Sequence, residues 1–195
     1  ASDVRTYVLG IDAAGGIPGG DLAAGVVLCA ETGEVAAVLH GLIGPEEMAH
    51  RLAALGKRYG GALVGGERDS WTMQVMQWLE RLGYPNVYYD DDGGKTPQLG
   101  FPNTHSGRLQ AVSALREAIK QGDFRAYDEA VVGELVRYQR KSENSGIESY
   151  SAPPGMHDDL CVAAQRAQQL RLSMPVGGAF ALRVGQGGET VISYP

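Results

Sequence analysis

The chain has 195 residues, 28 of them glycine, with a formal net charge of −6 at pH 7 and 44% hydrophobic residues. These values suit one folded domain with a real core, and they lack the overall basic charge that usually accompanies independent nucleic-acid binding. The two cysteines, Cys29 and Cys161, form neither a disulfide framework nor a zinc motif, so we expect two reduced, buried thiols. No apolar run reaches the length of a membrane span, and we expect no membrane partner.

The first third of the chain is predicted to form three strands, a helix and a fourth strand. Apolar runs at 6–12, 24–30 and 34–41 are typical of strands, with a hairpin turn between the second and the third. A helix is expected over 44–61, and a short buried strand at 62–67. A right-handed crossover would place this fourth strand parallel to the first.

The rest of the chain is predicted to be mainly helical. We expect a helix over 70–83, a fifth short strand at 86–90, a loop over 91–103, and helices over 106–122 and 128–140. The segment 141–155 is predicted as a loop or hairpin, a final helix opens at His157, and 177–195 is predicted as a small hairpin. Apolar residues on one face of the 70–83 helix are interpreted as core, not as a base-stacking surface; they are Trp71, Val75, Trp78, Leu79 and Leu82.

This order of elements predicts an α/β fold: a mixed five-stranded sheet flanked by helices on both faces, with a small C-terminal hairpin. Two of the predicted strands end in an acid, Asp12 and Glu67. If these strands are adjacent and parallel, the two carboxylates emerge at one edge of the sheet, about 5 Å apart. Buried unpaired carboxylates are costly, and Mg²⁺ or Mn²⁺, which prefer carboxylate oxygens, would compensate their charge.

A third acidic group, His157 followed by Asp158 and Asp159, stands where the final helix begins. These residues could supply the third side of a metal cage. They could equally cap the helix, because Asp is a favoured N-cap and acids suit the positive end of the helix dipole. The strand-end acids also have simpler interpretations. Asp12 could be a turn residue, and Glu67 could form a solvated ion pair with Arg68.

The segments 7–28, 59–90, 100–119 and 156–167 resemble, in order and spacing, the nuclease domain of the large terminase subunit of tailed bacteriophages. The most specific pieces are Gly-Ile-Asp at 10–12, Glu-Arg at 67–68, the stretch Leu-Gly-Tyr-Pro-Asn-Val-Tyr-Tyr-Asp at 82–90 and His-Asp-Asp at 157–159. The resemblance covers about residues 5–172. One departure is at 69–72, where this chain has Asp-Ser-Trp-Thr and local DNA contacts are expected to differ.

The resemblance implies a ribonuclease H-like fold and a metal-dependent endonuclease that cuts double-stranded concatemeric viral DNA at the initiation and termination of packaging. Matched position by position, the catalytic and metal-binding acids are Asp12, Glu67, Asp158 and Asp159; His157 and Asp21 are lesser candidates. Two divalent cations, Mg²⁺ or Mn²⁺, would activate a water and stabilise the leaving 3′-oxygen. Which of Asp158 and Asp159 contacts metal directly stays open.

The implied partners are double-stranded DNA, the ATPase domain of the full-length protein, the small terminase subunit and the portal, in the host cytoplasm during virion assembly. We expect contacts mainly to phosphates, hence low sequence specificity, with Arg68, Arg140 and Lys141 as candidate DNA-binding residues. Residues 1–195 are expected to form one nuclease domain, with 175–195 as an appendage beyond the resemblance. No Gly-x-x-x-x-Gly-Lys-[Ser/Thr] motif is present, so we expect the ATPase domain to be absent from this chain.

Three other functions compete with this interpretation. Residues 8–16 resemble the first phosphate-binding hairpin of actin-like kinases, but such an ATP-binding phosphotransferase needs a second domain of the same kind; ATP binding would reveal it. A DNA-gripping or motor-docking module with little activity of its own would lose nothing when Asp12 is replaced. Another nuclease of the same fold, such as a Holliday-junction resolvase, would prefer four-way junctions to linear duplex.

Overall fold

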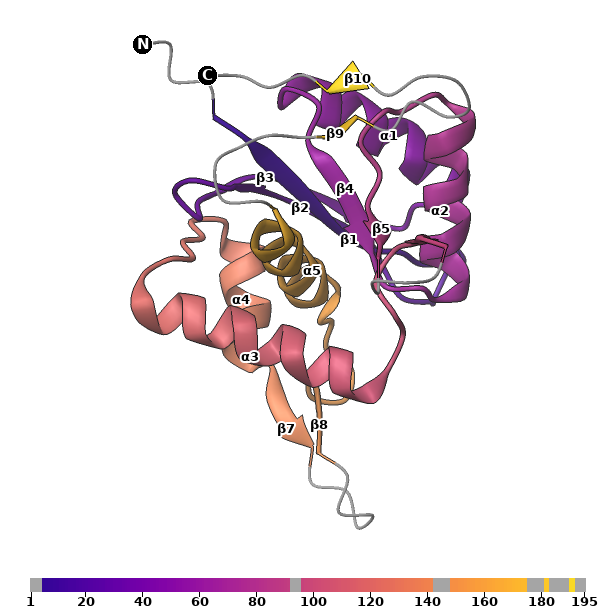
Figure 1. Cartoon of the computed structure of the whole chain (residues 1–195). Helices are drawn as coiled ribbons and strands as arrows, with labels where there is room; N and C mark the ends of the chain where they lie inside the picture. Colours follow the sequence, from indigo (N-terminus) through magenta and orange to yellow (C-terminus); the bar gives the residue numbers. More distant parts are fainter. Residues whose placement is uncertain (1–4, 92–95, 142–147, 175–180, 183–189, 192–195) are drawn as a thin grey trace.

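A computed structural model describes residues 5–91, 96–141, 148–174, 181–182 and 190–191 (Figure 1). Its central sheet has four strands in the order β3-β2-β1-β4. Their bounds are β1 Tyr7–Asp12, β2 Ala23–Cys29, β3 Val35–Gly41 and β4 Leu63–Gly66. β1 pairs with β2 antiparallel and with β4 in parallel, as predicted. The predicted fold class, a mixed sheet flanked by helices, is therefore confirmed, but with four strands instead of five.

The segment predicted as the fifth strand joins β4 only through an isolated parallel bridge between Val64 and Val87. The reason is that two segments share the outer edge of β4. Tyr88 N–H donates to the carbonyl of Val64, whereas Phe101 N–H donates to the carbonyl of Gly66, two residues further along. β5 (Tyr89–Asp90) consequently leaves the main sheet and pairs with β6 (Gln98–Leu99), in a stretch predicted as loop.

Helices cover both faces of the sheet (Figure 1). α1 and α2 pack together on one face, and α5 lies across the other face, with α3 and α4 against it. The bounds are α1 Pro45–Arg58, α2 Ser70–Arg81, α3 His105–Gln121, α4 Glu129–Arg137 and α5 Asp159–Ser173. The five predicted helices are thus confirmed, although α4 ends earlier than expected because 139–141 form β7.

Two antiparallel hairpins complete the described structure. β7 (Gln139–Lys141) pairs with β8 (Ser149–Ser151), and this hairpin projects away from the body of the molecule (Figure 1). β9 (Ala181–Leu182) pairs with β10 (Thr190–Val191), as the predicted C-terminal hairpin requires. No helix among the described residues combines the length and apolarity needed to cross a bilayer.

Side-chain alternation along β1 divides the core into two clusters. Leu9 and Ile11 point toward α1 and α2, whereas Val8 points toward α5. Cys29 and Cys161 are free and buried, as predicted. The predicted apolar stripe of α2 is only partly core. Val75 and Leu79 are fully buried, but Trp71, at the first turn of the helix, lies against Gly15 in the loop after β1 and is 40% exposed.

The position of α5 is fixed by the absence of a side chain at Gly10. A Cβ at this residue would lie 2.1 Å from the backbone nitrogen of Ala167 and 2.2 Å from the carbonyl oxygen of Ala163. The helix backbone therefore rests directly on β1. One helical turn before Ala163 is Asp159, and two residues after Gly10 is Asp12, so the close approach brings the start of α5 to the end of β1.

Candidate metal centre

The two strand-end acids reach the same edge and the same face of the sheet. Asp12 is the last residue of β1, and Glu67 follows the last registered pair between the strands, Ile11 and Gly66. Asp12 lies two residues beyond Gly10 and so shares its face, toward α5. Glu67 contacts Arg166 of α5, which places it on that face as well. The parallel pairing of β1 with β4 thus places these two residues at the ends of neighbouring strands, as the sequence predicts.

The carboxyl group of Asp12 lies in an acidic surrounding. Its pKa is raised well above the ordinary value, first by burial and then by the negative charges of Asp159 and Asp69, with a smaller contribution from Asp158. The positive charge of Arg166 acts in the opposite direction. A group of this kind takes up a proton or a cation, because its ionised form is otherwise undercompensated.

Glu67 is already paired with two arginines. Arg108 Nε of α3 donates to Glu67 Oε1 at 3.0 Å, and Arg166 Nη2 of α5 lies 3.1 Å from Glu67 Oε2. The Arg166 side chain is 3% exposed, whereas that of Arg108 is 57% exposed. Glu67 does not pair with Arg68, whose guanidinium instead donates to Gly100 and to acceptors on β5 and β6.

The two aspartates at the start of α5 have different surroundings. Asp158 is the N-cap residue, yet its side chain makes no capping hydrogen bond; its Oδ2 accepts from the backbone N–H of Ala152 at 2.8 Å. Asp159 is 7% exposed, and its Oδ2 has no hydrogen-bond donor among the described residues. A capping hydrogen bond therefore does not account for Asp158, whereas Asp159 lies in the first turn of α5, where an acid suits the helix dipole.

A carboxylate from another helix satisfies this end of α5. Glu134 of α4 is 4% exposed, and its Oε2 accepts from the backbone N–H of Cys161 at 3.0 Å. Burial raises the pKa of Glu134, while the Cys161 N–H and the positive charge of His40 act to lower it. The buried acid thus provides the N-terminal cap of α5 from outside the helix.

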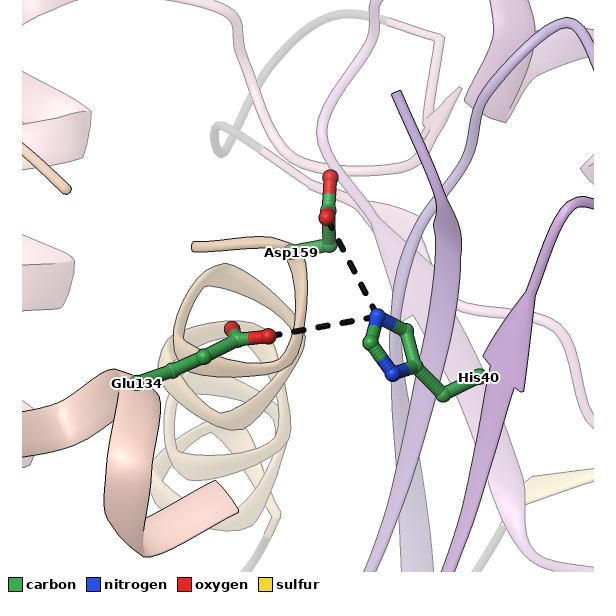
Figure 2. Close-up of side chains that lie close together, drawn as sticks. All are labelled: His40, Glu134 and Asp159. Carbon is green, nitrogen blue, oxygen red and sulfur yellow. Dashed lines mark ion pairs between the residues drawn. The ribbon is translucent and has the colours of Figure 1, made fainter. Parts of the chain in front are cut away.

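Glu134 and Asp159 converge on a histidine of β3, as Figure 2 shows. His40 Nε2 lies 3.9 Å from Glu134 Oε1 and 3.9 Å from Asp159 Oδ2. Asp159, and to a smaller extent Glu134, raise the pKa of His40 against the opposing effect of burial. Sequence reasoning missed both His40 and Glu134. One available signal was an acid on the apolar face of the 128–140 helix, three residues after the buried Val131.

These observations fit divalent cations. The donor set consists of carboxylates and an imidazole, the carboxylate of Asp12 is crowded by other acids, and a buried oxygen of Asp159 lacks a donor. Arg166 and the histidines beside Asp159 compensate only part of the negative charge of these carboxylates.

Comparisons with known proteins identify the fold. No protein-family model and no curated protein sequence matches the chain. Among solved structures, the large terminase nuclease of the thermophilic phage G20c with bound magnesium is similar at a TM-score of 0.71 and 21% identity, over 87% of this chain and 82% of that chain. The large terminase nuclease domain of Thermus phage P74-26 is similar at a TM-score of 0.67 and 22% identity, over 84% of this chain and 78% of that chain. The chain has the terminase nuclease fold. The resemblance predicted from the sequence is thereby confirmed at the level of fold.

Within this terminase nuclease fold, the remaining predicted site residues lie further out. His157 is half exposed, and its Nδ1 is 3.2 Å from Asp159 Oδ2 without the geometry of a hydrogen bond. Asp21 is exposed in the loop before β2. Arg140 and Lys141 are exposed on the β7–β8 hairpin, where Arg140 pairs with Glu148 at 3.7 Å.

Proposed function

We propose that this chain is a metal-dependent endonuclease that cleaves double-stranded concatemeric viral DNA when genome packaging begins and ends. The observation that carries the proposal is the placement of Asp12 and Glu67 at the ends of adjacent parallel strands, with Asp159 close enough for its charge to raise the pKa of Asp12. The shared fold with terminase nuclease domains, one of them described with bound magnesium, supports it.

In this proposal Asp12, Glu67 and Asp159 hold two divalent cations, Mg²⁺ or Mn²⁺. When bound, such ions activate a water and stabilise the leaving 3′-oxygen of a phosphodiester. Arg166 orients Glu67 from the buried side. Asp158 is a positioning residue, because its carboxylate ties the loop at Ala152 to the start of α5 and so holds the backbone that carries Asp159.

Substrate binding is proposed to rely on phosphate contacts and to show little sequence preference. Arg140 and Lys141 are suitably exposed, whereas Arg68 has most of its donors engaged inside the protein. The net charge of −6 indicates weak affinity for DNA by this chain alone. The ATPase domain of a full-length terminase, the small terminase subunit and the portal would supply the remaining affinity and place cleavage in the host cytoplasm during virion assembly.

Plasmid cleavage with Mn²⁺, Mg²⁺, Ca²⁺ or EDTA tests this proposal. The wild-type chain should nick and linearise supercoiled plasmid with Mn²⁺ or Mg²⁺, and Asp12→Asn should abolish both products while folding normally. Asp123→Asn is the matched control, because Asp123 is an exposed acid just after α3 and is not among the candidate site residues. Equal cleavage by wild type and Asp12→Asn would refute the proposed centre.

One observation favours a second candidate, the DNA-gripping or motor-docking module. Both carboxylate oxygens of Glu67 are taken by arginines, an arrangement that lowers the demand for a cation there. This candidate predicts no cleavage at any metal concentration, together with DNA retention that Asp12→Asn leaves unchanged. A junction resolvase would instead cut four-way junctions in preference to linear duplex.

A further inference from the structure

A second group of possible metal ligands lies beside the proposed nuclease centre. Asp12 and His40 are both paired with Ala24 of β2, so they occupy one line across the sheet and point to the same face. Two strand spacings, about 10 Å, separate their backbones. The His40 group is therefore next to the strand-end acids and shares only Asp159 with them.

We propose that His40, Glu134 and Asp159 form a binding site for a divalent transition-metal ion. Their ligand atoms all lie within 4.8 Å of one another. Ligand atoms bonded to one tetrahedral ion at about 2.1 Å lie about 3.4 Å apart, so each of the two observed separations of 3.9 Å would shorten by about 0.5 Å when an ion binds. The three residues come from β3, α4 and α5, and their side chains point to a common place in Figure 2.

Unsatisfied atoms indicate that this place suits a ligand. Asp159 Oδ2 and His40 Nε2 are buried atoms without a hydrogen-bond partner among the described residues, and the Asp159 side chain is 9% exposed. The two carboxylate oxygens of Glu134 have different partners. Its Oε2 accepts from Cys161 N–H and caps α5, while its Oε1 faces His40. One oxygen of each carboxylate thus remains for an ion.

Charge and donor chemistry select the kind of ion. Two carboxylates and a neutral imidazole balance an ion of charge +2, whereas a proton on His40 balances only one of the two acids. Imidazole nitrogen favours Zn²⁺ or Co²⁺ over Mg²⁺ and Mn²⁺, which prefer carboxylate and water oxygens. An ion here would fix Asp159 and join α4 to the start of α5, next to the carboxylate of Asp12.

Co²⁺ titration of the full chain in excess Mg²⁺ tests this site without any measurement of cleavage. Visible absorption from Co²⁺ should saturate at one ion per chain in the wild type. His40→Gln should weaken that binding by at least about 100-fold, more than the loss of an outer partner of a metal ligand costs. His50→Gln is the matched control, because His50 is exposed on α1 and should change nothing.

Two further variants keep the outcome decisive. Glu134→Gln retains an oxygen for the Cys161 N–H and removes the charge, so it should weaken Co²⁺ binding while preserving the helix cap. Asp12→Asn should leave Co²⁺ binding intact even though the proposed nuclease activity is lost, which separates the two proposals. Unchanged Co²⁺ binding in both His40→Gln and Glu134→Gln would overturn the site. So would a near-ultraviolet thiolate band, because it would assign the ion to Cys161.

Discussion

Glu67 and Asp159 lie on the same face of the sheet and are almost equally buried, at 9% and 7% exposure, yet their partners differ. Both oxygens of Glu67 meet a guanidinium. Asp159 Oδ2 meets only imidazoles and has no hydrogen-bond donor among the described residues. The charge of Glu67 is therefore compensated by two arginines, whereas Asp159 Oδ2 has, within the described part of the chain, only two imidazoles near it and no hydrogen bond.

The different partners of Glu67 and Asp159 indicate different roles, one structural and one functional. Leaving a buried carboxylate without a partner costs several kcal/mol, and a protein that keeps one gives up stability there. Arg166 removes that cost at Glu67 from the interior. At Asp159 the cost persists in the absence of a cation, as expected for a ligand and not for a structural ion pair.

Of the two aspartates at the start of α5, Asp159 should give the larger effect when it is neutralised. We expect Asp159→Asn to reduce plasmid cleavage by about 10³-fold, because a metal ligand contributes several kcal/mol and each 1.36 kcal/mol is tenfold in rate. Asp158→Asn should lose less than about tenfold, because the amide oxygen can still accept from Ala152 N–H and hold the loop.

The measurement is the initial rate of nicking at saturating Mn²⁺, with thermal melting to verify folding of both variants. Equal losses in Asp158→Asn and Asp159→Asn would show that both carboxylates contact cations directly. The distinction drawn here between a ligand and a positioning residue would then be wrong.

The pairing of Arg166 with Glu67 is tested by measuring the stability of the protein. Arg166→Met removes a buried cation and leaves Glu67 and Asp12 undercompensated, so we expect the free energy of unfolding in EDTA to fall by about 3 kcal/mol. Part of the loss should be recovered with Mg²⁺, which can replace the missing charge. Arg116→Met, at an exposed position of α3, should change stability by less than about 0.5 kcal/mol.

Urea unfolding with and without Mg²⁺ gives both the loss in the free energy of unfolding and the part of it that Mg²⁺ recovers. A loss that Mg²⁺ does not reduce would mean that Arg166 supports packing of α5 alone, and that its charge does not matter to the carboxylates near it.

The sequence predicts well what short-range patterns determine. Asp12 and Glu67 end apolar strands, and the crossover rule makes those strands parallel, so their meeting was predictable. The same kind of pattern located the five helices. The division of the β4 edge between Tyr88 and Phe101 depends on where a long connection returns, and no local signal shows it.

The contacts of Glu134 and His40 at the start of α5 could not be predicted from the sequence, for a similar reason. Glu134 caps α5 only because α4 docks against the start of that helix, and His40 joins it from the far edge of the sheet. Trp71 belongs to an apolar stripe by its spacing, but it lies against Gly15 of the loop after β1 and stays 40% exposed. Such contacts depend on how whole elements pack, not on residue spacing.

The smallest expected effect concerns the exposed half of the Glu67 pairing. Arg108 is 57% exposed, so its pair with Glu67 should contribute at most about 1 kcal/mol to stability. Any cation bound by Glu67 must compete with this guanidinium. We therefore expect Arg108→Gln to lower the Mn²⁺ concentration for half-maximal cleavage by up to about fivefold, the factor that 1 kcal/mol represents.

Arg51→Gln is the matched control, because Arg51 is about as exposed as Arg108 and pairs with Glu47 on α1, on the opposite face of the sheet. It should leave the metal dependence unchanged. If Arg108→Gln instead raises the required Mn²⁺ concentration, then Arg108 holds Glu67 in the orientation that cations need. Glu67 as well as Asp159 would then depend on neighbouring protein groups for its orientation, and the contrast between the two acids would be one of degree.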